Sequence, residues 1–268
     1  MALDSLFAHI ERLQGDRPWG RVLDAGTGSH SLAWIAGLTT ESSTAVTGEL
    51  GRARGLEREF SSRLRPRDRI VVGNWTDPLL LHCEVFDVVL ADYLLGAVDG
   101  FAPYFQDRLF TRLRPHVGGR LYVVGLEPYP DSTDSPAGRI VLEIARLVNA
   151  CILLAGHRMF REYPLEWVLR SLDASGYVVE DAKSFPIVRG MKFVEEQLDV
   201  CQRKLPHIEP SLSRELARTM AKLRDRALTQ CGVERGLRFG EDYVVAARSV
   251  GDASLVRFPV LKLSGSGP

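Results

Sequence analysis

The chain has 268 residues, in which 34 Lys plus Arg balance 34 Asp plus Glu, and 45% of the residues are hydrophobic. This composition excludes a disordered chain, because it can bury enough apolar surface to offset the loss of chain entropy. The zero net charge disfavours nucleic acid as the main partner, since phosphate binding is led by clusters of Lys and Arg.

The first half of the chain alternates short β-branched runs with amphipathic stretches. A short helix that ends near Gly15 comes first. Strands are then predicted at 21–25, 45–47, 70–72, 86–90 and 121–126, and helices at 31–36, 51–64 and 101–113. Such alternation is typical of βαβ units, whose parallel strands are buried on both faces and read as continuous apolar runs. We therefore expect an α/β fold with a doubly wound sheet.

The second half has longer helical patterns. A turn-rich loop after Glu127 leads to a helix expected to begin at Ser135-Pro136 and to run to about residue 154. Another helix is expected at 164–176, and a strand at 177–182 follows it. Residues 191–231 have a helical pattern with breaks near 205–206 and 210, and a last strand is expected at 243–247. The Gly/Ser-rich tail, 264–268, is expected to be flexible.

The strongest motif is Val22-Leu23-Asp24-Ala25-Gly26-Thr27-Gly28-Ser29, in which a strand runs into two glycines and then into a helix. Glycine lets the backbone approach a ligand closely, and the N–H groups at a helix start attract a polar or negatively charged group. A second acid, Glu49, follows the next strand 21 residues after Gly28 and could accept hydrogen bonds from ribose hydroxyls.

A dinucleotide site also uses a glycine loop and the N–H groups at a helix start. A nicotinamide-dependent, NAD(P)-linked oxidoreductase is therefore one alternative. Two details count against it. The third glycine of a G-x-G-x-x-G pattern is Ser31 here. The Asp24 carboxylate would also face a pyrophosphate unfavourably, whereas it suits the ammonium group of an amino-acid ligand.

The D-A-G-T-G segment with Glu49 resembles the class I S-adenosylmethionine-dependent methyltransferases. Val71-Val72-Gly73-Asn74-Trp75 stands where that family places a polar residue against the adenine amino group. The segment 86–93 resembles its fourth motif, and 113–121 resembles its approach to strand five. The resemblance covers roughly residues 18–127, and 163–180 and 240–248 match as an element pattern. Ser29 and Asn74 depart from the family pattern, which often has glycine and aspartate there.

The resemblance implies a Rossmann-like, seven-stranded and mostly parallel sheet that binds S-adenosyl-L-methionine (SAM), with S-adenosyl-L-homocysteine (SAH) as the product. The residues that it assigns to cofactor binding are Asp24, Gly26, Thr27, Gly28, Ser29, Glu49, Leu50, Asn74, Trp75, Asp92 and Tyr93. Simpler roles remain open for five of these positions. Asp24 could cap a helix, Glu49 could be an exposed first-turn acid, Trp75 could belong to the core, and 92–93 could be a plain strand-to-helix turn.

Two segments are longer than a plain methyltransferase sheet requires: 128–162 after the fifth strand, and 187–235 between the sixth and seventh. Ligands of open α/β sheets bind beyond the carboxyl ends of the strands, where both segments begin. We therefore expect a single domain, 1–268, in which these two insertions form a helical cap over the active face. A lid excludes water and encloses a small acceptor, whereas a polymer needs an open groove.

The expected reaction is in-line transfer of a methyl group to an oxygen, nitrogen or sulfur atom of a small metabolite. An oxygen or nitrogen acceptor needs a base, for which Tyr93, Glu127 and His157 are the candidates, with His116 a further one. Tyr129, Arg139 and Arg189 are candidate acceptor-binding residues, because an aromatic ring suits a cationic methyl donor and two guanidinium groups suit an acceptor carboxylate.

Two further alternatives stay open: a methyltransferase acting on protein or RNA, and a non-catalytic binding protein with the same fold. We expect a monomer or homodimer without a membrane partner. The four cysteines lie far apart and indicate neither a disulfide framework nor a zinc site, so no metal is expected. The first 17 residues carry acids and lack the apolar core of a secretory signal, which favours a cytoplasmic location.

Overall fold

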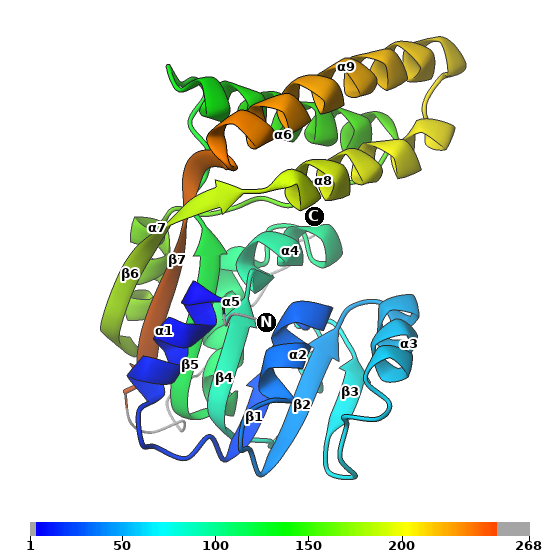
Figure 1. Cartoon of the computed structure of the whole chain (residues 1–268). Helices are drawn as coiled ribbons and strands as arrows, with labels where there is room; N and C mark the ends of the chain where they lie inside the picture. Colours follow the sequence, from blue (N-terminus) through cyan, green and yellow to red (C-terminus); the bar gives the residue numbers. More distant parts are fainter. Residues whose placement is uncertain (1–3, 251–268) are drawn as a thin grey trace, which may run out of the picture.

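The computed structural model describes residues 4–250, so the tail predicted at 264–268 lies outside the described residues. A seven-stranded sheet in the order β3-β2-β1-β4-β5-β7-β6 runs through the molecule (Figure 1). The strands are β1 (Arg21–Asp24), β2 (Ser42–Thr47), β3 (Arg69–Val72), β4 (Phe86–Asp92), β5 (Val117–Leu126), β6 (Tyr177–Arg189) and β7 (Leu237–Ser249). Only β7 runs antiparallel to its neighbours, β5 and β6. The predicted doubly wound, mostly parallel sheet is therefore confirmed.

Helices cover both faces of this sheet. One face packs against α1 (Ser5–Gln14) and α2 (Ser29–Ile35), with α3 (Leu50–Glu59) beside β2 and β3. The other face packs against α4 (Leu94–Phe101), α5 (Gln106–Leu113) and α7 (Leu165–Ala174). Successive residues of β4 alternate between the two layers: Val88 and Leu90 join the first, and Val89 and Ala91 the second. A strand buried on both sides has to be apolar throughout, which explains its sequence.

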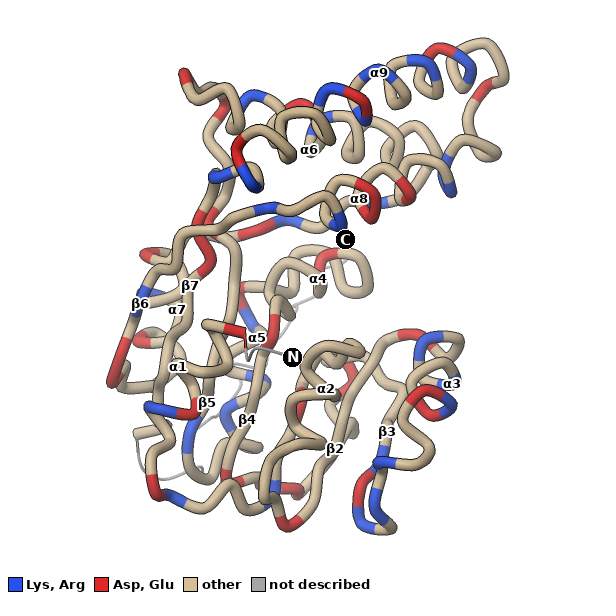
Figure 2. Tube along the Cα trace, viewed as in Figure 1, with Lys and Arg blue, Asp and Glu red and all other residues tan. Residues whose placement is uncertain are grey.

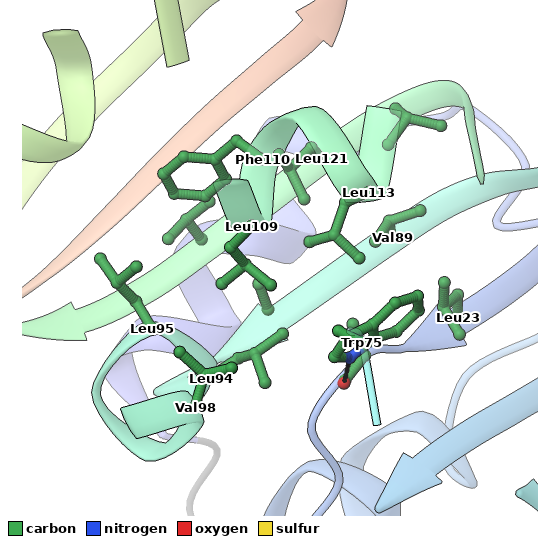
Figure 3. Close-up of a cluster of buried hydrophobic side chains, with 14 of the residues drawn as sticks. Leu23, Trp75, Val89, Leu94, Leu95, Val98, Leu109, Phe110, Leu113 and Leu121 are labelled. Carbon is green, nitrogen blue, oxygen red and sulfur yellow. Dashed lines mark hydrogen bonds between the residues drawn. The ribbon is translucent and has the colours of Figure 1, made fainter. Parts of the chain in front are cut away.

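The segment after β4 differs from the sequence-based prediction of one helix over 101–113. It forms two helices, α4 and α5, separated by a turn in which Tyr104 has a φ of +66°. Gly96 and Gly100 weaken the helical pattern of α4, yet Leu94, Leu95 and Val98 are buried and anchor it to the sheet. Figure 3 shows these three side chains packed beside the residues of α5. Tertiary packing therefore forms a helix that local propensity did not indicate.

The last two strands are also longer than predicted, at 13 residues each. Their pairing extends from Tyr177↔Ser249 to Arg189↔Leu237, beyond the carboxyl ends of the parallel strands. β6 is an edge strand, so it tolerates Pro186, which has no N–H to donate. This long hairpin connects the sheet to the helices that follow.

Three helices form a cap: α6 (Pro136–Leu154), α8 (Met191–Lys204) and α9 (Pro210–Glu234). They enclose an apolar cluster of their own, in which Val194, Leu198 and Ala227 are fully buried. The cap lies beyond the carboxyl ends of the strands (Figure 1), and its helices fall inside the two long segments 128–162 and 187–235. In the part of the chain that the structure describes, no helix is both long and apolar enough to cross a bilayer.

Candidate functional site

The glycine loop between β1 and α2 is held by a short network of hydrogen bonds. Ser31 Oγ donates to Asp24 Oδ2 at 2.7 Å and accepts from the Gly28 N–H at 3.1 Å. The backbone N–H of Thr27 donates to Val46 O of β2 at 2.8 Å. Ser31, which replaces the third glycine of the dinucleotide pattern, therefore fixes the Asp24 carboxyl against the loop. The simpler role of Asp24 as a side-chain cap is not seen, because the N-cap of α2 is Gly28 and the side chain that accepts from its N–H is that of Ser31.

The second carboxyl oxygen of Asp24 is free. Asp24 is 1% exposed, and its Oδ1 is buried without a hydrogen-bond partner. Burial raises the pKa of Asp24 to about 6, although the hydrogen bond from Ser31 acts to lower it. A buried, unpaired acceptor is costly unless a ligand satisfies it. Oδ1 is therefore the oxygen of this buried carboxyl that is left without a partner within the protein.

A pocket opens next to this loop, between the ends of β1, β2 and β3 and helix α4. Its cavity volume is ≈ 110 Å³, which is smaller than the roughly 300–1,000 Å³ typical of small-molecule sites. The lining residues are Ala25, Gly26, Thr27, Val46, Thr47, Gly48, Gly73, Asn74, Trp75, Leu94, Ala97, Val98 and Phe101. Four of them come from α4, the helix that the sequence did not predict.

The end of α4 closes one side of the pocket. Asn74 Nδ2 donates to Phe101 O at 2.8 Å, and Asn74 Oδ1 accepts from the backbone N–H of Thr76 at 3.0 Å. A Cβ added at Gly48 would lie 2.8 Å from the Phe101 ring, so a larger residue there would require the ring to move. Both polar ends of Asn74 are therefore already used within the protein.

The other residues predicted to bind the cofactor differ in their exposure to solvent. Trp75 lines the pocket but is 3% exposed, and its indole N–H donates to Ala25 O at 2.7 Å (Figure 3). Glu49 and Leu50 are exposed at the start of α3, next to Gly48 at the rim. The hydroxyl of Ser29 points toward α3, where it donates to Glu59 at 2.8 Å.

Asp92 and Tyr93 lie at the junction of β4 and α4. Tyr93 is the residue before α4 and has a left-handed conformation, φ +47°, which is strained for a tyrosine. Burial, and then the charges of Asp24, Asp4 and Asp242, raise the pKa of Asp92 to about 8. Burial together with Asp242 raises the pKa of Tyr93 far above its ordinary value. Tyr93 is therefore a neutral hydroxyl at physiological pH and a poor general base.

Comparison with known proteins identifies this fold. No family model matches the sequence, and no curated protein matches it. A protein of Bacillus halodurans assigned as a methyltransferase matches in structure with a TM-score of 0.58 at 15% identity, covering 91% of this chain and 98% of its own. The mycolic acid cyclopropane synthase CmaA1, solved with SAH and CTAB, matches with a TM-score of 0.53 at 15% identity, covering 91% and 84%. The chain has the class I methyltransferase fold.

The methyltransferase fold by itself does not set the reaction. The [4+2]-cyclase SpnF also matches, with a TM-score of 0.53 at 17% identity over 91% of this chain and 80% of its own. One fold thus carries more than one chemistry, and the function has to be argued from the residues of the site.

The candidate bases of this methyltransferase fold are not brought together. Glu127 follows β5, and its Oε2 accepts from the Leu165 N–H at the start of α7 at 2.9 Å. His157 is exposed after α6, where its ring packs 5.8 Å from that of His207. His116 lies at the opposite, amino end of β5 between Arg112 and Glu84 O, and burial lowers its pKa. Its position is structural.

The three candidate acceptor-binding residues do not all lie in one place. Arg189, at the end of β6, donates to the Tyr129 hydroxyl at 3.3 Å and stacks over Phe193 at 4.8 Å. Its Nε is buried without a partner. Arg139 is exposed on α6 and donates to Asp134 O at 2.8 Å. Arg189 and Tyr129 therefore lie together between sheet and cap, whereas Arg139 lies on the outer surface.

Sequence reasoning missed two acids at this edge, Asp242 of β7 and Glu162 before α7. Burial raises the pKa of Asp242, and burial together with Asp242 raises the pKa of Glu162 to about 7. Asp242 lies one residue before the strand predicted at 243–247, and Glu162 lies in a loop without a motif. No local pattern marks either residue.

Proposed function

We propose that the protein is a SAM-dependent methyltransferase that acts on a small molecule. The observation that carries the proposal is the unpartnered Oδ1 of Asp24, buried beside a glycine loop that opens into a pocket. A carboxylate there suits the methionyl ammonium of SAM and would repel the pyrophosphate of a dinucleotide. This favours a methyltransferase over the oxidoreductase alternative.

The chemical types of the residues at this pocket suit the parts of SAM. Asp24 would take the ammonium group, and the loop at Gly26 and Gly28 would lie along the amino-acid part. The pocket under Phe101 would hold the adenosine, with Glu49 at the rim available to the ribose hydroxyls. The apolar residues of α4 would supply one wall, as in most small-molecule sites.

When bound, SAM supplies an electrophilic methyl group for in-line displacement. The contribution of this chain is then to orient the acceptor, exclude water and handle a proton. The cap and α4 exclude water. Asp92, whose pKa is raised to about 8, is mostly protonated at neutral pH and can exchange a proton there.

A small acceptor is favoured by charge as well as by the cap. Figure 2 shows that Lys and Arg alternate with Asp and Glu along α8 and α9, as expected for a solvated surface without a basic path for a phosphate backbone. We therefore place the methyl acceptor among small molecules rather than nucleic acids.

Isothermal titration calorimetry tests the proposal. SAM and SAH should each bind in a 1:1 ratio, and Asp24→Asn should weaken both by tenfold or more. Asp107→Asn, which changes an exposed acid in the first turn of α5, is the matched control. Circular dichroism and thermal unfolding verify that each variant is folded.

Two results would overturn the proposal. Failure of the folded wild-type protein to bind SAM or SAH would remove it, and a fluorescence titration that detects tight binding of a reduced dinucleotide would replace it with the oxidoreductase alternative. Binding of SAH together with a protein partner, without turnover of any small acceptor, would favour the non-catalytic alternative.

A further inference from the structure

Phe101, the last residue of α4, covers one side of the pocket that we assign to the cofactor. Its ring lies over Gly48, the residue after β2, because a Cβ added to Gly48 would be 2.8 Å from a ring carbon. Phe101 lines the pocket and is also 47% exposed, so its ring has protein on one side and solvent on the other. The ring therefore borders the pocket without being enclosed in a core.

The chain on either side of Phe101 is anchored. Val98 and Ala102 are buried in the core that α4 shares with the sheet, whereas Gly100 and Phe101 between them are exposed. Gly100 has no Cβ, so its backbone is less restricted than that of the other residues in this turn. The Phe101 ring can therefore turn while the rest of α4 stays in place.

A side chain from another element fixes the position of Phe101. Asn74, two residues after β3, donates through Nδ2 to Phe101 O at 2.8 Å. Its Oδ1 accepts from the N–H of Thr76 at 3.0 Å and from the Thr76 hydroxyl at 2.9 Å. An amide oxygen has two lone pairs, and both have a donor here. Asn74 Oδ1 is therefore not free to accept from an adenine amino group, and the amide serves to hold Phe101.

The bond from Asn74 to Phe101 is exposed to solvent. Water can replace either partner, so an exposed hydrogen bond has a small net effect on stability. Such a bond can break and form again without a large cost. It suits a contact that opens, in contrast to the buried bond from the Trp75 indole to Ala25 O on the inner wall of the same pocket.

The size of the pocket requires a wall to move. Its cavity volume of ≈ 110 Å³ is below the roughly 300–1,000 Å³ typical of small-molecule sites. Trp75, Leu94 and Val98 of the lining are buried, whereas Phe101 is exposed. Movement of the Phe101 ring is therefore the smallest change that enlarges the cavity.

We propose that Phe101 is a gate over the adenosine end of the cofactor pocket and that Asn74 keeps this gate closed. This inference rests on the proposed function. The ring turns away from Gly48 to admit the cofactor, and it returns over the adenosine when the bond from Asn74 to Phe101 forms again. Entry and release of the cofactor then share one opening step, so the gate slows both.

A fixed wall would behave differently from a gate. Loss of a wall contact weakens binding mainly through faster release, and the association rate changes little. Loss of a gate raises the association and dissociation rates together, because the ligand crosses the same barrier in both directions. The association rate therefore distinguishes the two roles of Phe101.

Stopped-flow mixing of the full chain with SAH measures both rates, and the fluorescence of Trp75 in the pocket lining provides a signal. The observed rate of the wild type should level off at high SAH concentration, because gate opening becomes limiting. Phe101→Ala should raise both rate constants by about fivefold or more and remove this plateau. Tyr104→Ala is the matched control, since Tyr104 is an exposed aromatic residue in the turn after α4 and lies outside the pocket lining.

Asn74→Ala tests the bond that holds the gate while the ring is kept. It should raise both rate constants by roughly twofold to tenfold, the factor that corresponds to the net effect of one hydrogen bond. Asn149→Ala, which changes an exposed asparagine of α6, is its control. Asn74→Ala also provides the second variant if Phe101→Ala fails to fold.

Binding of SAH to the wild type is measured first by calorimetry. If SAH binds and neither variant raises the association rate, only the gate fails. A rise in the dissociation rate alone identifies a fixed wall and overturns the gate, as does an equal rise of both rates in the control variants. If SAH does not bind to the folded wild type, the proposed function fails and the gate fails with it.

Discussion

Ser31 donates its hydroxyl proton to Asp24 Oδ2 at 2.7 Å, inside the loop that joins β1 to α2. The bond orients the carboxyl and favours its ionised form, because a hydroxyl donor stabilises negative charge. It also leaves Oδ1 as the free oxygen. A glycine at position 31 would provide neither effect, which distinguishes this loop from the dinucleotide pattern.

Ser31→Ala should therefore weaken SAM binding. A hydrogen bond to a charged group contributes about 1.5–3 kcal/mol, which corresponds to a loss of roughly tenfold to a hundredfold in affinity. The pKa of Asp24 should rise further, so that the variant needs a higher pH than the wild type to reach its best affinity. Calorimetry from pH 5.5 to 8.5 measures both effects. Ser61→Ala, an exposed hydroxyl that donates to Arg58 O, should behave like the wild type.

Asp92 should make the ligand-free protein less stable as the pH rises. Its pKa is raised from 3.8 to about 8, so between these values the folded protein binds more protons than the unfolded chain. The free energy of unfolding then falls with increasing pH across this window. Asp92→Asn removes the effect and should stabilise the protein at pH 8 by on the order of a few kcal/mol, with little change near pH 4.

Urea unfolding of both proteins at pH 4.5 and pH 8 measures this difference. A variant that is less stable than the wild type at pH 8 would contradict the burial of an unpaired carboxyl at the end of β4.

Gly48→Ala should disturb the pocket without disturbing the sheet. The new Cβ would lie 2.8 Å from the Phe101 ring, so the ring, which borders the pocket, has to turn or shift. Overpacking of this kind costs about 1–3 kcal/mol, and the affinity for SAH should fall accordingly. Gly55→Ala is the control: it lies in α3 with no atom within 4 Å, and it should keep its SAH affinity and gain up to about 1 kcal/mol of stability. Unchanged SAH binding by Gly48→Ala would mean that Phe101 does not border the cofactor.

Leu198→Ala should loosen the cap and leave the sheet intact. Leu198 is fully buried in the apolar cluster of α6, α8 and α9, and its truncation should cost about 2–5 kcal/mol. Hydrogen exchange should accelerate in these three helices and stay slow in β1, β4 and β5, while SAH still binds. Val89→Ala, in the core of the sheet, should instead accelerate exchange in the strands. Equal acceleration everywhere would show that cap and sheet unfold as one unit.

Much of this protein could be predicted from local pattern. The strand runs and the two glycines after Asp24 indicated the parallel sheet, and α6, α8 and α9 fall within the long segments 128–162 and 187–235. These features are local because a buried strand or a close backbone approach constrains neighbouring residues directly. The predictions for Asp92 and Tyr93 also put them at the right edge, since the end of a parallel strand is visible in the sequence.

Other features depended on residues that are distant in the chain. Helix α4 forms because Leu94, Leu95 and Val98 are buried against the sheet, although its glycines lower its helix propensity. His157 looked like a candidate base, yet the fold carries it to the exposed end of the cap. Asn74 looked like a free acceptor for adenine, yet Phe101 and Thr76 occupy its amide.

The sequence by itself determined the type of sheet and the glycine loop after β1, because both follow from the periodicity and the backbone needs of adjacent residues. Only the tertiary structure decided which acids lie at the same edge and on the same face of the sheet. Asp92 and Asp242 are 150 residues apart, and they share one face because β5 lies between β4 and β7 with a particular register. Strand order and register are set by packing over the whole sheet, so no local pattern can indicate them.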